Sequence, residues 1–314
     1  MTATRKLTLG EGSTPLVAAP RLSEALGVRL YLKCEGLNPT GSFKDRGMAV
    51  AVGGALEAGA HTVVCASTGN TAASAAAYAA RAGLRAVVLM PQGATASAKR
   101  AQARSAGARL FELAGSFDDA LRCCRELAEQ DGFVLVNSLN PDRIEGQKSV
   151  VRELLDDLGA APDVVALPFG GGGNASAVAQ GFAEAEEAPR LIAGEAAERT
   201  TTWASAIRIG EPAHAVEIAE LESAGRLEVE TLSESEIRAA WSDLATVEGV
   251  FCEPASAAGL AALRRAGAPE GSLAVCILTG HGLKDTDAVA EDVATAVEPS
   301  VGAILEVLQS EAVQ

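Results

Sequence analysis

The sequence lacks the features that would place it in a membrane or on nucleic acid. Its 314 residues contain no apolar run near the roughly 20 residues that a membrane-spanning helix needs, and the N-terminal segment has no apolar core typical of a signal peptide. It also has no block of lysines or arginines, and 41 acidic against 26 basic side chains give a formal charge of −15. We therefore expect a cytoplasmic protein that binds neither nucleic acid nor membrane, and whose partner is a small molecule. An anionic small molecule would need a locally electropositive pocket.

Metal-ligand and disulfide patterns are missing as well. The six cysteines show no CxxC spacing, and the three histidines are far apart in the sequence. Cys34, Cys65 and Cys276 lie in apolar runs typical of strands, where a reduced core thiol is expected. The sequence therefore predicts no metal centre and no disulfide framework.

What the chain does contain is an alternation of two kinds of segment. Short apolar runs rich in β-branched residues alternate with alanine-rich stretches typical of helices. This pattern predicts an α/β fold with mostly parallel sheets flanked by helices, and the length indicates about two domains. The expected strands are 29–34, 62–66, 86–90, 109–113, 133–137, 164–167, 191–194 and 273–278. The expected helices are 45–58, 71–82, 96–106, 117–129, 144–158, 174–186, 234–247 and 256–265.

Three loops follow predicted strands, at the edge where parallel sheets bind ligands. Residues 66–71 (Ala-Ser-Thr-Gly-Asn-Thr) are typical either of an ordinary helix cap or of a carboxylate or phosphate site. Residues 170–174 are four glycines and an asparagine, typical either of a phosphate-binding turn or of a flexible loop. Residues 278–285 place glycines around His281 and a hydroxyl, Thr279, at the end of a strand, although a plain glycine-rich turn is the alternative.

The glycine loop also allows a different interpretation. Gly170, Gly172 and Ala175 match the G-x-G-x-x-A fingerprint of dinucleotide-binding folds, and Glu195 ends the next predicted strand. A nicotinamide-dependent dehydrogenase is therefore an alternative. That alternative uses one loop and leaves the other polar loops without a role.

Lys44 follows a turn-rich segment at the start of a predicted helix. Arginines outnumber lysines twenty to six, so a lysine here suggests chemistry that arginine cannot perform. Only the lysine amine can lose its proton near neutral pH and attack a carbonyl, and a helix N-terminus disfavours its charged form. A solvated first-turn lysine is the alternative. A lysine nucleophile, a phosphate-binding loop, a polar loop and a hydroxyl together predict a site that holds pyridoxal 5′-phosphate as a Schiff base.

Several longer motifs resemble threonine synthase, one of the fold type II (tryptophan-synthase-β-like) pyridoxal-phosphate enzymes. These motifs are Leu-Gly-Glu-Gly-Ser-Thr-Pro-Leu at 9–16 and the segments 38–48, 66–71, 137–148, 206–210, 248–258 and 278–285. The resemblance implies a lyase that converts O-phospho-L-homoserine and water to L-threonine and phosphate by γ-elimination and β-addition. The alternative is a paralogue that acts on another activated amino acid, such as a serine/threonine dehydratase or a β- or γ-replacement enzyme.

The resemblance also implies a role for each site residue. Lys44 would bind the cofactor covalently and transfer protons during catalysis. The other cofactor-binding residues would be Phe43, Asn70, Gly170, Gly171, Gly172, Gly173, Asn174 and Thr279. The substrate carboxylate would be bound by Ser67, Thr68 and Thr71, and the substrate phosphate by Ser138, Arg143 and Asn174.

The fold type further implies how the chain is divided. Residues 5–46 and 145–314 would form a large cofactor-binding domain, residues 47–144 a small substrate-binding domain, and two chains a homodimer. Two positions depart from the family, since it commonly has asparagine at the position of Gly171 and lysine at that of Ala94. These departures bear on the native substrate rather than on the cofactor.

Overall fold

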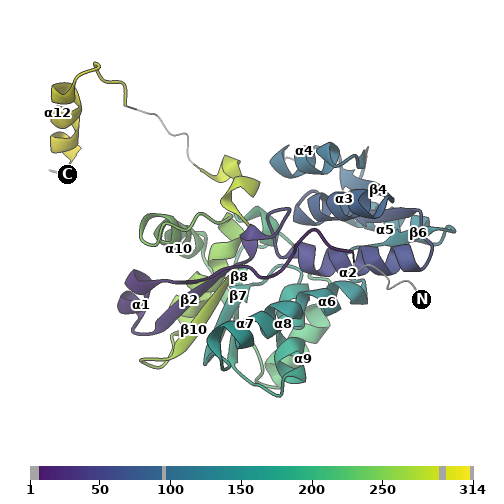
Figure 1. Cartoon of the computed structure of the whole chain (residues 1–314), viewed down its shortest axis with the longest axis horizontal. Helices are drawn as coiled ribbons and strands as arrows, with labels where there is room; N and C mark the ends of the chain where they lie inside the picture. Colours follow the sequence, from purple (N-terminus) through teal and green to yellow (C-terminus); the bar gives the residue numbers. More distant parts are fainter. Residues whose placement is uncertain (1–6, 94–96, 290–294, 312–314) are drawn as a thin grey trace.

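The strands form two sheets that lie in separate parts of the molecule (Figure 1). The structure is a computed structural model that describes residues 7–93, 97–289 and 295–311. The larger sheet has the order β1-β2-β10-β7-β8-β9, in which β1 pairs antiparallel with β2 and the other pairs are parallel. Its strands are β1 (Leu16–Ala18), β2 (Arg29–Cys34), β7 (Val164–Pro168), β8 (Arg190–Ala196), β9 (Glu228–Leu232) and β10 (Leu273–Leu278).

The smaller sheet is parallel throughout, in the order β5-β4-β3-β6. Its strands are β3 (Thr62–Ala66), β4 (Arg85–Pro91), β5 (Arg109–Leu113) and β6 (Phe133–Leu135). The predicted α/β class with mostly parallel sheets is therefore confirmed, and all eight predicted strands are present. The sequence pattern does not predict β1 and β9, because β1 has only three residues and β9 is an edge strand with two glutamates.

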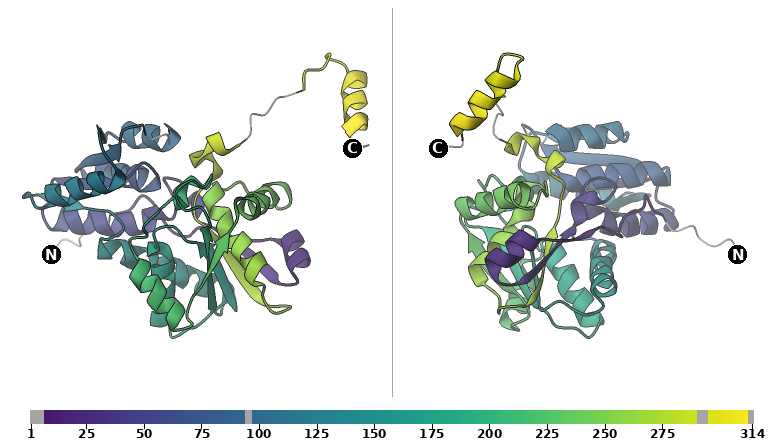
Figure 2. Two further views of the ribbon diagram at one scale, coloured as in Figure 1. Left: turned by 180° about the vertical axis from the view of Figure 1, so that it is seen from behind. Right: turned by 60° about the vertical axis from the view of Figure 1, so that its left-hand side comes forward.

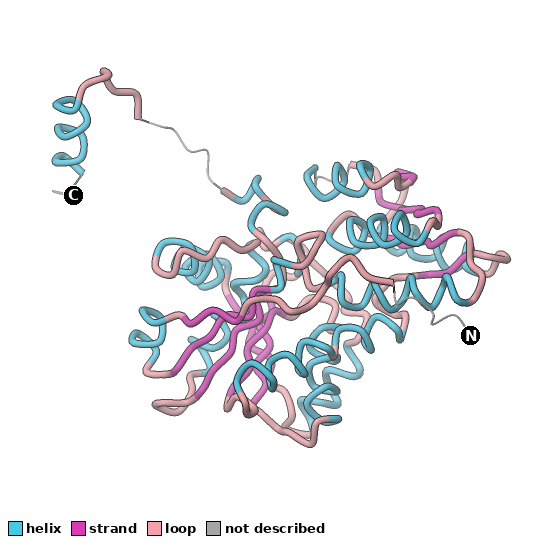
Figure 3. The backbone as a smooth tube through the Cα atoms, viewed as in Figure 1, coloured by secondary structure: helices cyan, strands magenta, loops and turns pink. Residues whose placement is uncertain are grey.

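Helices surround both sheets, as the cyan and magenta tubes of Figure 3 show. They are α1 (Pro20–Leu26), α2 (Lys44–Glu57), α3 (Asn70–Ala82), α4 (Ser97–Ser105), α5 (Phe117–Ala128), α6 (Pro141–Gln147), α7 (Ser149–Leu158), α8 (Gly173–Glu184), α9 (Ala215–Ser223), α10 (Glu234–Thr246), α11 (Ala258–Ala266) and α12 (Val301–Glu311). In both views of Figure 2, α12 stands apart from the rest of the chain. No helix in the described ranges is both long and apolar enough to cross a membrane.

The predicted helix 144–158 is in fact two helices, α6 and α7, which meet at Lys148. It also begins earlier than predicted. The Asn140 side chain accepts a hydrogen bond from the Asp142 N–H at 2.9 Å, and Pro141 is the first residue of α6. Asparagine at the cap followed by proline is a favourable helix start, so a local signal was available in the sequence.

The core lies on both faces of each sheet. In β7, Val164 and Ala166 pack into one apolar cluster, whereas Val165 and Leu167 pack into the cluster on the opposite face. Successive strand residues point to opposite faces, so a strand covered on both sides reads as a continuous apolar run. The four-stranded sheet repeats this arrangement, with Val63 and Val64 in different clusters. This two-sided burial leaves the loops at the strand ends as the places for polar side chains.

The predicted domain division stays a prediction. Its boundaries at 46/47 and 144/145 fall inside α2 and α6, and the strands of the smaller sheet lie between them. Parts of the predicted large domain, residues 5–6, 290–294 and 312–314, lie outside the described residues, as does Ala94.

A buried ion network fastens the first turn of α2 to its neighbours. Arg46 is 3% exposed, with Nε 2.6 Å from Glu35 Oε2 and Nη1 2.6 Å from Glu153 Oε1. Glu153 also lies 3.0 Å from Lys33 Nζ and accepts from the Ser13 N–H at 2.7 Å. Because the charges compensate one another, they can be buried without leaving an isolated ion.

We expect Glu153→Gln to destabilise the protein near neutral pH. Burial raises the pKa of Glu153, but hydrogen bonds and charge from Arg46 outweigh this effect and lower it from 4.5 to about 2. The stabilising contribution of the carboxylate is therefore present above pH 4.5 and lost as the pH falls toward 2. Urea unfolding near pH 7 should show a loss of about 2 kcal/mol, after allowing for solvent screening of this partly exposed group.

The pH dependence separates this effect from a general packing defect. Below pH 4.5 the stability of Glu153→Gln should fall less steeply than that of the unmodified protein. The control is Asp156→Asn, an exposed carboxylate on the same helix, α7. Equal slopes for Glu153→Gln and the unmodified protein would contradict the assignment.

Candidate active site

The segment before Lys44 is bound to the loop that follows β10. The Phe43 N–H donates to the Thr279 carbonyl at 3.0 Å, and Ser42 forms a backbone bridge with Gly280. Lys44 is the first residue of α2. The structure therefore brings the predicted nucleophile close to the predicted hydroxyl at the end of β10.

The amine of Lys44 lies in an environment that disfavours its charged form. Nζ lies 4.3 Å from the centroid of the Phe43 ring and has no ion-pair partner among the described residues. Burial and then the positive charge of Arg143 lower the pKa of Lys44 from 10.5 to about 7, although Glu253 opposes the change. A large fraction of the amine is therefore neutral near pH 7, as attack on an aldehyde requires.

The loop after β3 combines the two functions that its sequence allows. Ser67 Oγ accepts from the N–H groups of Gly69 at 3.1 Å and Ala72 at 3.3 Å, which is a helix-capping role. Asn70 Nδ2 donates to both carboxylate oxygens of Glu253 at 3.0 Å, while Asn70 Oδ1 is buried without a partner in the described structure. Ser67 thus stabilises the loop, and Asn70 keeps an acceptor for a ligand.

Arg143, on α6, is a buried cation without a carboxylate partner among the described residues. Its side chain is 1% exposed, Nη1 donates to the Val136 carbonyl at 2.9 Å, and Nε has no partner there. Burial lowers the pKa of Arg143 to about 10. A buried guanidinium without a counter-ion is unfavourable by several kcal/mol, so an anionic ligand is the group that would compensate it.

Two glycines allow α6 to approach α2 closely. A Cβ at Gly47 would lie 2.4 Å from the Arg143 carbonyl oxygen, and one at Gly146 would lie 2.3 Å from the Arg46 carbonyl oxygen. A side chain at either position would push the two helices apart. The contact places the helix that carries Arg143 against the helix that begins at Lys44.

The glycine loop, residues 170–174, follows β7 and includes the first two residues of α8. Gly172 has a φ of +87°, and a Cβ there would lie 2.9 Å from His214 Cβ, so a side chain would be strained. Gly171 is different, because the nearest atom to a Cβ there lies 3.5 Å away. Asn174 Nδ2 is buried without a described partner. A glycine turn and an unpaired amide at the N-terminus of α8 are what a phosphate group needs.

His214 connects the glycine loop to Ser138. The His214 N–H donates to the Gly171 carbonyl at 3.1 Å, and ring Nε2 lies 3.0 Å from the Ser138 carbonyl oxygen. Ser138, like Thr68 and Thr71, is half-buried. Sequence reasoning missed this role of His214, because the histidine stands alone after segment 206–210 and belongs to none of the motifs.

The hydroxyl of Thr279 is held by a second hydroxyl. Thr279 is 5% exposed, and its Oγ1 lies 3.1 Å from Oγ of Ser256, in the 3₁₀ turn Pro254–Ala257. Ser256 Oγ also accepts from the Gly280 N–H at 2.9 Å. Ser256 therefore orients Thr279 in the site. It lies in segment 248–258 of the motifs above, although no role was predicted for it.

Further buried charges complete the site. Lys99 and Glu253 are each 2% exposed, and Lys99 Nζ lies 3.5 Å from both Glu253 Oε2 and Asp285 Oδ2. Lys284 is 8% exposed and donates to a carbonyl of the turn before α2 at 2.7 Å. Lysine is rare in this chain, so the rarity that singles out Lys44 applies equally to Lys99 and Lys284. Glu253 lies in segment 248–258, one of the motifs quoted for the resemblance, but no role was predicted for this carboxylate.

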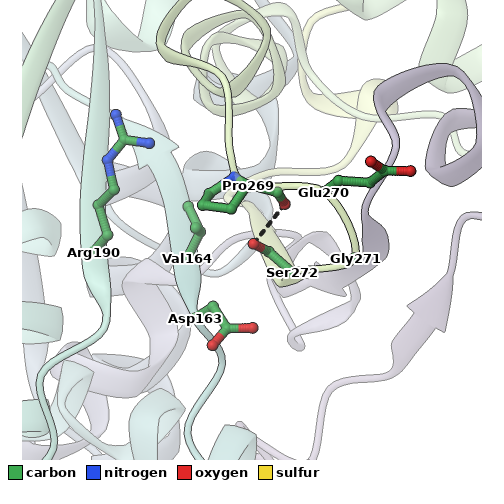
Figure 4. Close-up of a pocket in the computed structure, with 7 residues that line it drawn as sticks. All are labelled: Asp163, Val164, Arg190, Pro269, Glu270, Gly271 and Ser272. Atoms are coloured by element: carbon green, nitrogen blue, oxygen red, sulfur yellow. Dashed lines mark hydrogen bonds between the residues drawn. The ribbon is translucent and has the colours of Figure 1, made fainter.

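A surface hollow of about 420 Å³ lies far from these residues, where β7, β8 and β10 begin. Figure 4 shows Asp163, Arg190 and Ser272 on its walls, with the Ser272 hydroxyl turned to the Pro269 carbonyl. This is the edge opposite to the one that carries the loops. It is not part of the candidate site.

A second hollow, of about 380 Å³, is lined by Phe169, Glu195 and Arg199, among other residues. Glu195 forms an ion pair with Arg199 and accepts from Thr231 Oγ1 at 2.9 Å. The carboxylate that a dinucleotide site would use is therefore already paired, and the geometry gives no support to the dehydrogenase alternative.

The donor set suits pyridoxal phosphate. The residues supply a largely neutral amine, a glycine turn at a helix N-terminus, a buried hydroxyl and two unpaired amide atoms. Within the described ranges, no cluster of three or more histidine, cysteine or acidic side chains could hold a metal ion.

Comparison with known proteins agrees with this assessment. Residues 7–280 match the family described as "Pyridoxal-phosphate dependent enzyme". The chain is 48% identical to a threonine synthase of Halalkalibacterium halodurans, over 94% of this chain and 89% of that protein. It is also 48% identical to a threonine synthase of Mycobacterium leprae, over 96% of this chain and 90% of that protein.

Solved structures show the same fold. An O-ureido-L-serine synthase, 25% identical, superposes with a TM-score of 0.77 over 94% of this chain and 97% of its own. A threonine deaminase from T.th. that is 29% identical superposes with a TM-score of 0.71 over 90% of this chain and 94% of its own. The chain therefore belongs to the pyridoxal-phosphate-dependent enzymes and, within them, to the threonine synthase family.

Proposed function

We propose that this enzyme converts O-phospho-L-homoserine and water to L-threonine and phosphate. The observation that carries the proposal is Arg143, a buried guanidinium with no carboxylate partner in the part of the chain that the structure describes, close enough to Lys44 to lower the pKa of its amine. A substrate with a phosphate group would supply the missing anion. The high identity to threonine synthases over most of the chain supports the same substrate.

The residues around Lys44 would hold the cofactor. Pyridoxal phosphate, when bound, withdraws electrons from the substrate and makes its Cα proton acidic. Lys44 would bind the aldehyde carbon beside Phe43, residues 170–174 would bind the phosphate, and Asn70 would contact the 3′-oxygen. Thr279 would contact the pyridine nitrogen with a neutral hydroxyl, which withdraws fewer electrons than a carboxylate partner would and suits elimination better than transamination.

The substrate would lie between two anion-binding regions. Ser67, Thr68 and Thr71 are at or near the N-terminus of α3, whose positive end favours the carboxylate. Arg143, Ser138 and Asn174 would bind the phosphate. Of these, the guanidinium of Arg143 has the geometry that matches phosphate oxygens.

The amine of Lys44 would move the protons. Its neutral form would take a proton from Cα and then one from Cβ, and the phosphate would leave Cγ with the electrons of its C–O bond. The amine would then return a proton at Cγ. Arg143 would stabilise the departing phosphate. Addition of a water hydroxyl at Cβ and of a proton at Cα then gives threonine, so that one water is consumed and one phosphate is released.

We keep the predicted division into a large cofactor-binding domain (5–46 and 145–314) and a small substrate-binding domain (47–144). The separate sheets of Figure 1 support it, since β3, β4, β5 and β6 lie within the smaller range. The homodimer and the cytoplasmic location also stay predictions of the sequence.

The substrate assignment is tested by assaying phosphate and threonine together. The holoenzyme incubated with O-phospho-L-homoserine should release both in equal amounts. Arg143→Ala should lower kcat/KM by about 100-fold or more, because it removes charge-assisted hydrogen bonds to the phosphate. Arg152→Ala, an exposed arginine on α7, is the matched control and should retain activity.

Three results would contradict this assignment. Release of phosphate without threonine would indicate a different acceptor. Absence of both products would indicate a different substrate. Turnover of serine or threonine that is unaffected in Arg143→Ala would favour the dehydratase alternative.

The pH dependence of cofactor capture tests the role of Lys44. The rate at which the apoenzyme binds pyridoxal phosphate covalently should rise with pH through about 7 and then level off, because the neutral amine predominates above that value. The measurement is the visible absorbance that appears on mixing. Lys44→Ala should give no label that borohydride fixes to the protein. A rise centred near 10.5, the ordinary pKa of lysine, would contradict the proposed environment.

A further inference from the structure

Glu253 is a buried carboxylate at the start of the 3₁₀ turn Pro254–Ala257. It is 2% exposed, and its N–H donates to the Gly280 carbonyl at 2.9 Å, next to Thr279. A Cβ at Gly280 would lie 2.1 Å from Glu253 Oε1, so the glycine is needed for this close approach. The carboxylate is thus held firmly against the loop after β10.

From this position Glu253 holds the amide of Asn70. Asn70 Nδ2 lies 3.0 Å from each carboxylate oxygen. A carboxylate paired with an ammonium ion only accepts hydrogen bonds, so it selects the orientation in which the amide nitrogen faces it. The Asn70 oxygen is then turned away, and it is buried without a partner among the described residues. Glu253 therefore fixes the orientation of the Asn70 amide.

The same carboxylate holds a second side chain. Lys99 Nζ, from α4, lies 3.5 Å from Glu253 Oε2. It lies equally far from Asp285 Oδ2 and donates to Ser205 Oγ at 3.2 Å. Asp285 therefore shares the pairing of Lys99 but makes no contact with Asn70 among the described hydrogen bonds. This difference provides an internal control.

We propose that Glu253 is a positioning residue that acts through Asn70. It fixes the orientation of the amide that contacts the 3′-oxygen of the bound cofactor, and thereby the protonation state of that oxygen. The inference rests on the proposed function for the contact between Asn70 and the cofactor.

The test is the absorption spectrum of the purified holoenzyme without substrate. Bound pyridoxal phosphate absorbs at different wavelengths in its two protonation forms, so the ratio of the two bands reports on the 3′-oxygen. Glu253→Gln is isosteric but can also donate, so the Asn70 amide loses its fixed orientation. The band ratio should change by about fivefold, the effect of one ordinary hydrogen bond. Asp285→Asn should leave the ratio unchanged.

A double-mutant cycle separates this role from a general structural effect. The spectral change caused by Glu253→Gln should disappear in an Asn70→Ala background, because the residue through which Glu253 acts is gone. If Glu253→Gln does not fold, Glu253→Asp, which withdraws the carboxylate by one methylene, should show the same change and the same dependence on Asn70.

Two results would overturn the inference. One is a spectrum of the Glu253 variant that matches that of the unmodified holoenzyme. The other is a change of equal size in the presence and absence of the Asn70 amide. Failure of the proposed function would look different, since the unmodified protein would then show no cofactor chromophore at all or no threonine formation.

Discussion

The contact between the start of α2 and the loop after β10 is the interaction on which the site depends. Phe43 donates to Thr279 and Ser42 pairs with Gly280, so two segments far apart in the chain become one surface. The ion network of Arg46 holds the first turn of α2 from another direction. Lys44 lies between these two attachments. The backbone on both sides of Lys44 is therefore fixed, which limits the positions that its flexible side chain can give to the amine.

The candidate site gathers positive charges, although the whole chain has a negative net charge. The formal charge is −15, yet Lys44, Lys99, Arg143 and Lys284 gather at the candidate site. Arg143 has no carboxylate partner among the described residues. Burial of Lys44 and the charge of Arg143 lower the pKa of the Lys44 amine. Buried cations that are incompletely paired also attract anions. An acidic protein can thus bind a phosphorylated substrate, because the relevant charge is local.

Much of the fold and the main loops could be predicted, because buried strands and glycine-rich loops leave local patterns. Strands buried on both faces, such as β7, appear in the sequence as continuous apolar runs, and the four consecutive glycines 170–173 are easily recognised. The short strand β1 and the charged edge strand β9 leave weak patterns. Glu253, Ser256 and His214 were missed for a different reason. Each acts by contacting a residue distant in sequence, and no local pattern records such a contact.

The sequence by itself determined the α/β class, the order of strands and helices along the chain, and which loops carry chemistry, because these follow from local hydrophobic periodicity and residue type. Only the tertiary structure decided that the pKa of Lys44 is lowered, that Arg143 has no counter-ion within the described ranges and that Glu253 binds Asn70. Burial and the distance between charges set these properties. Both arise only when separate segments pack together, so they are absent from any single stretch of the chain.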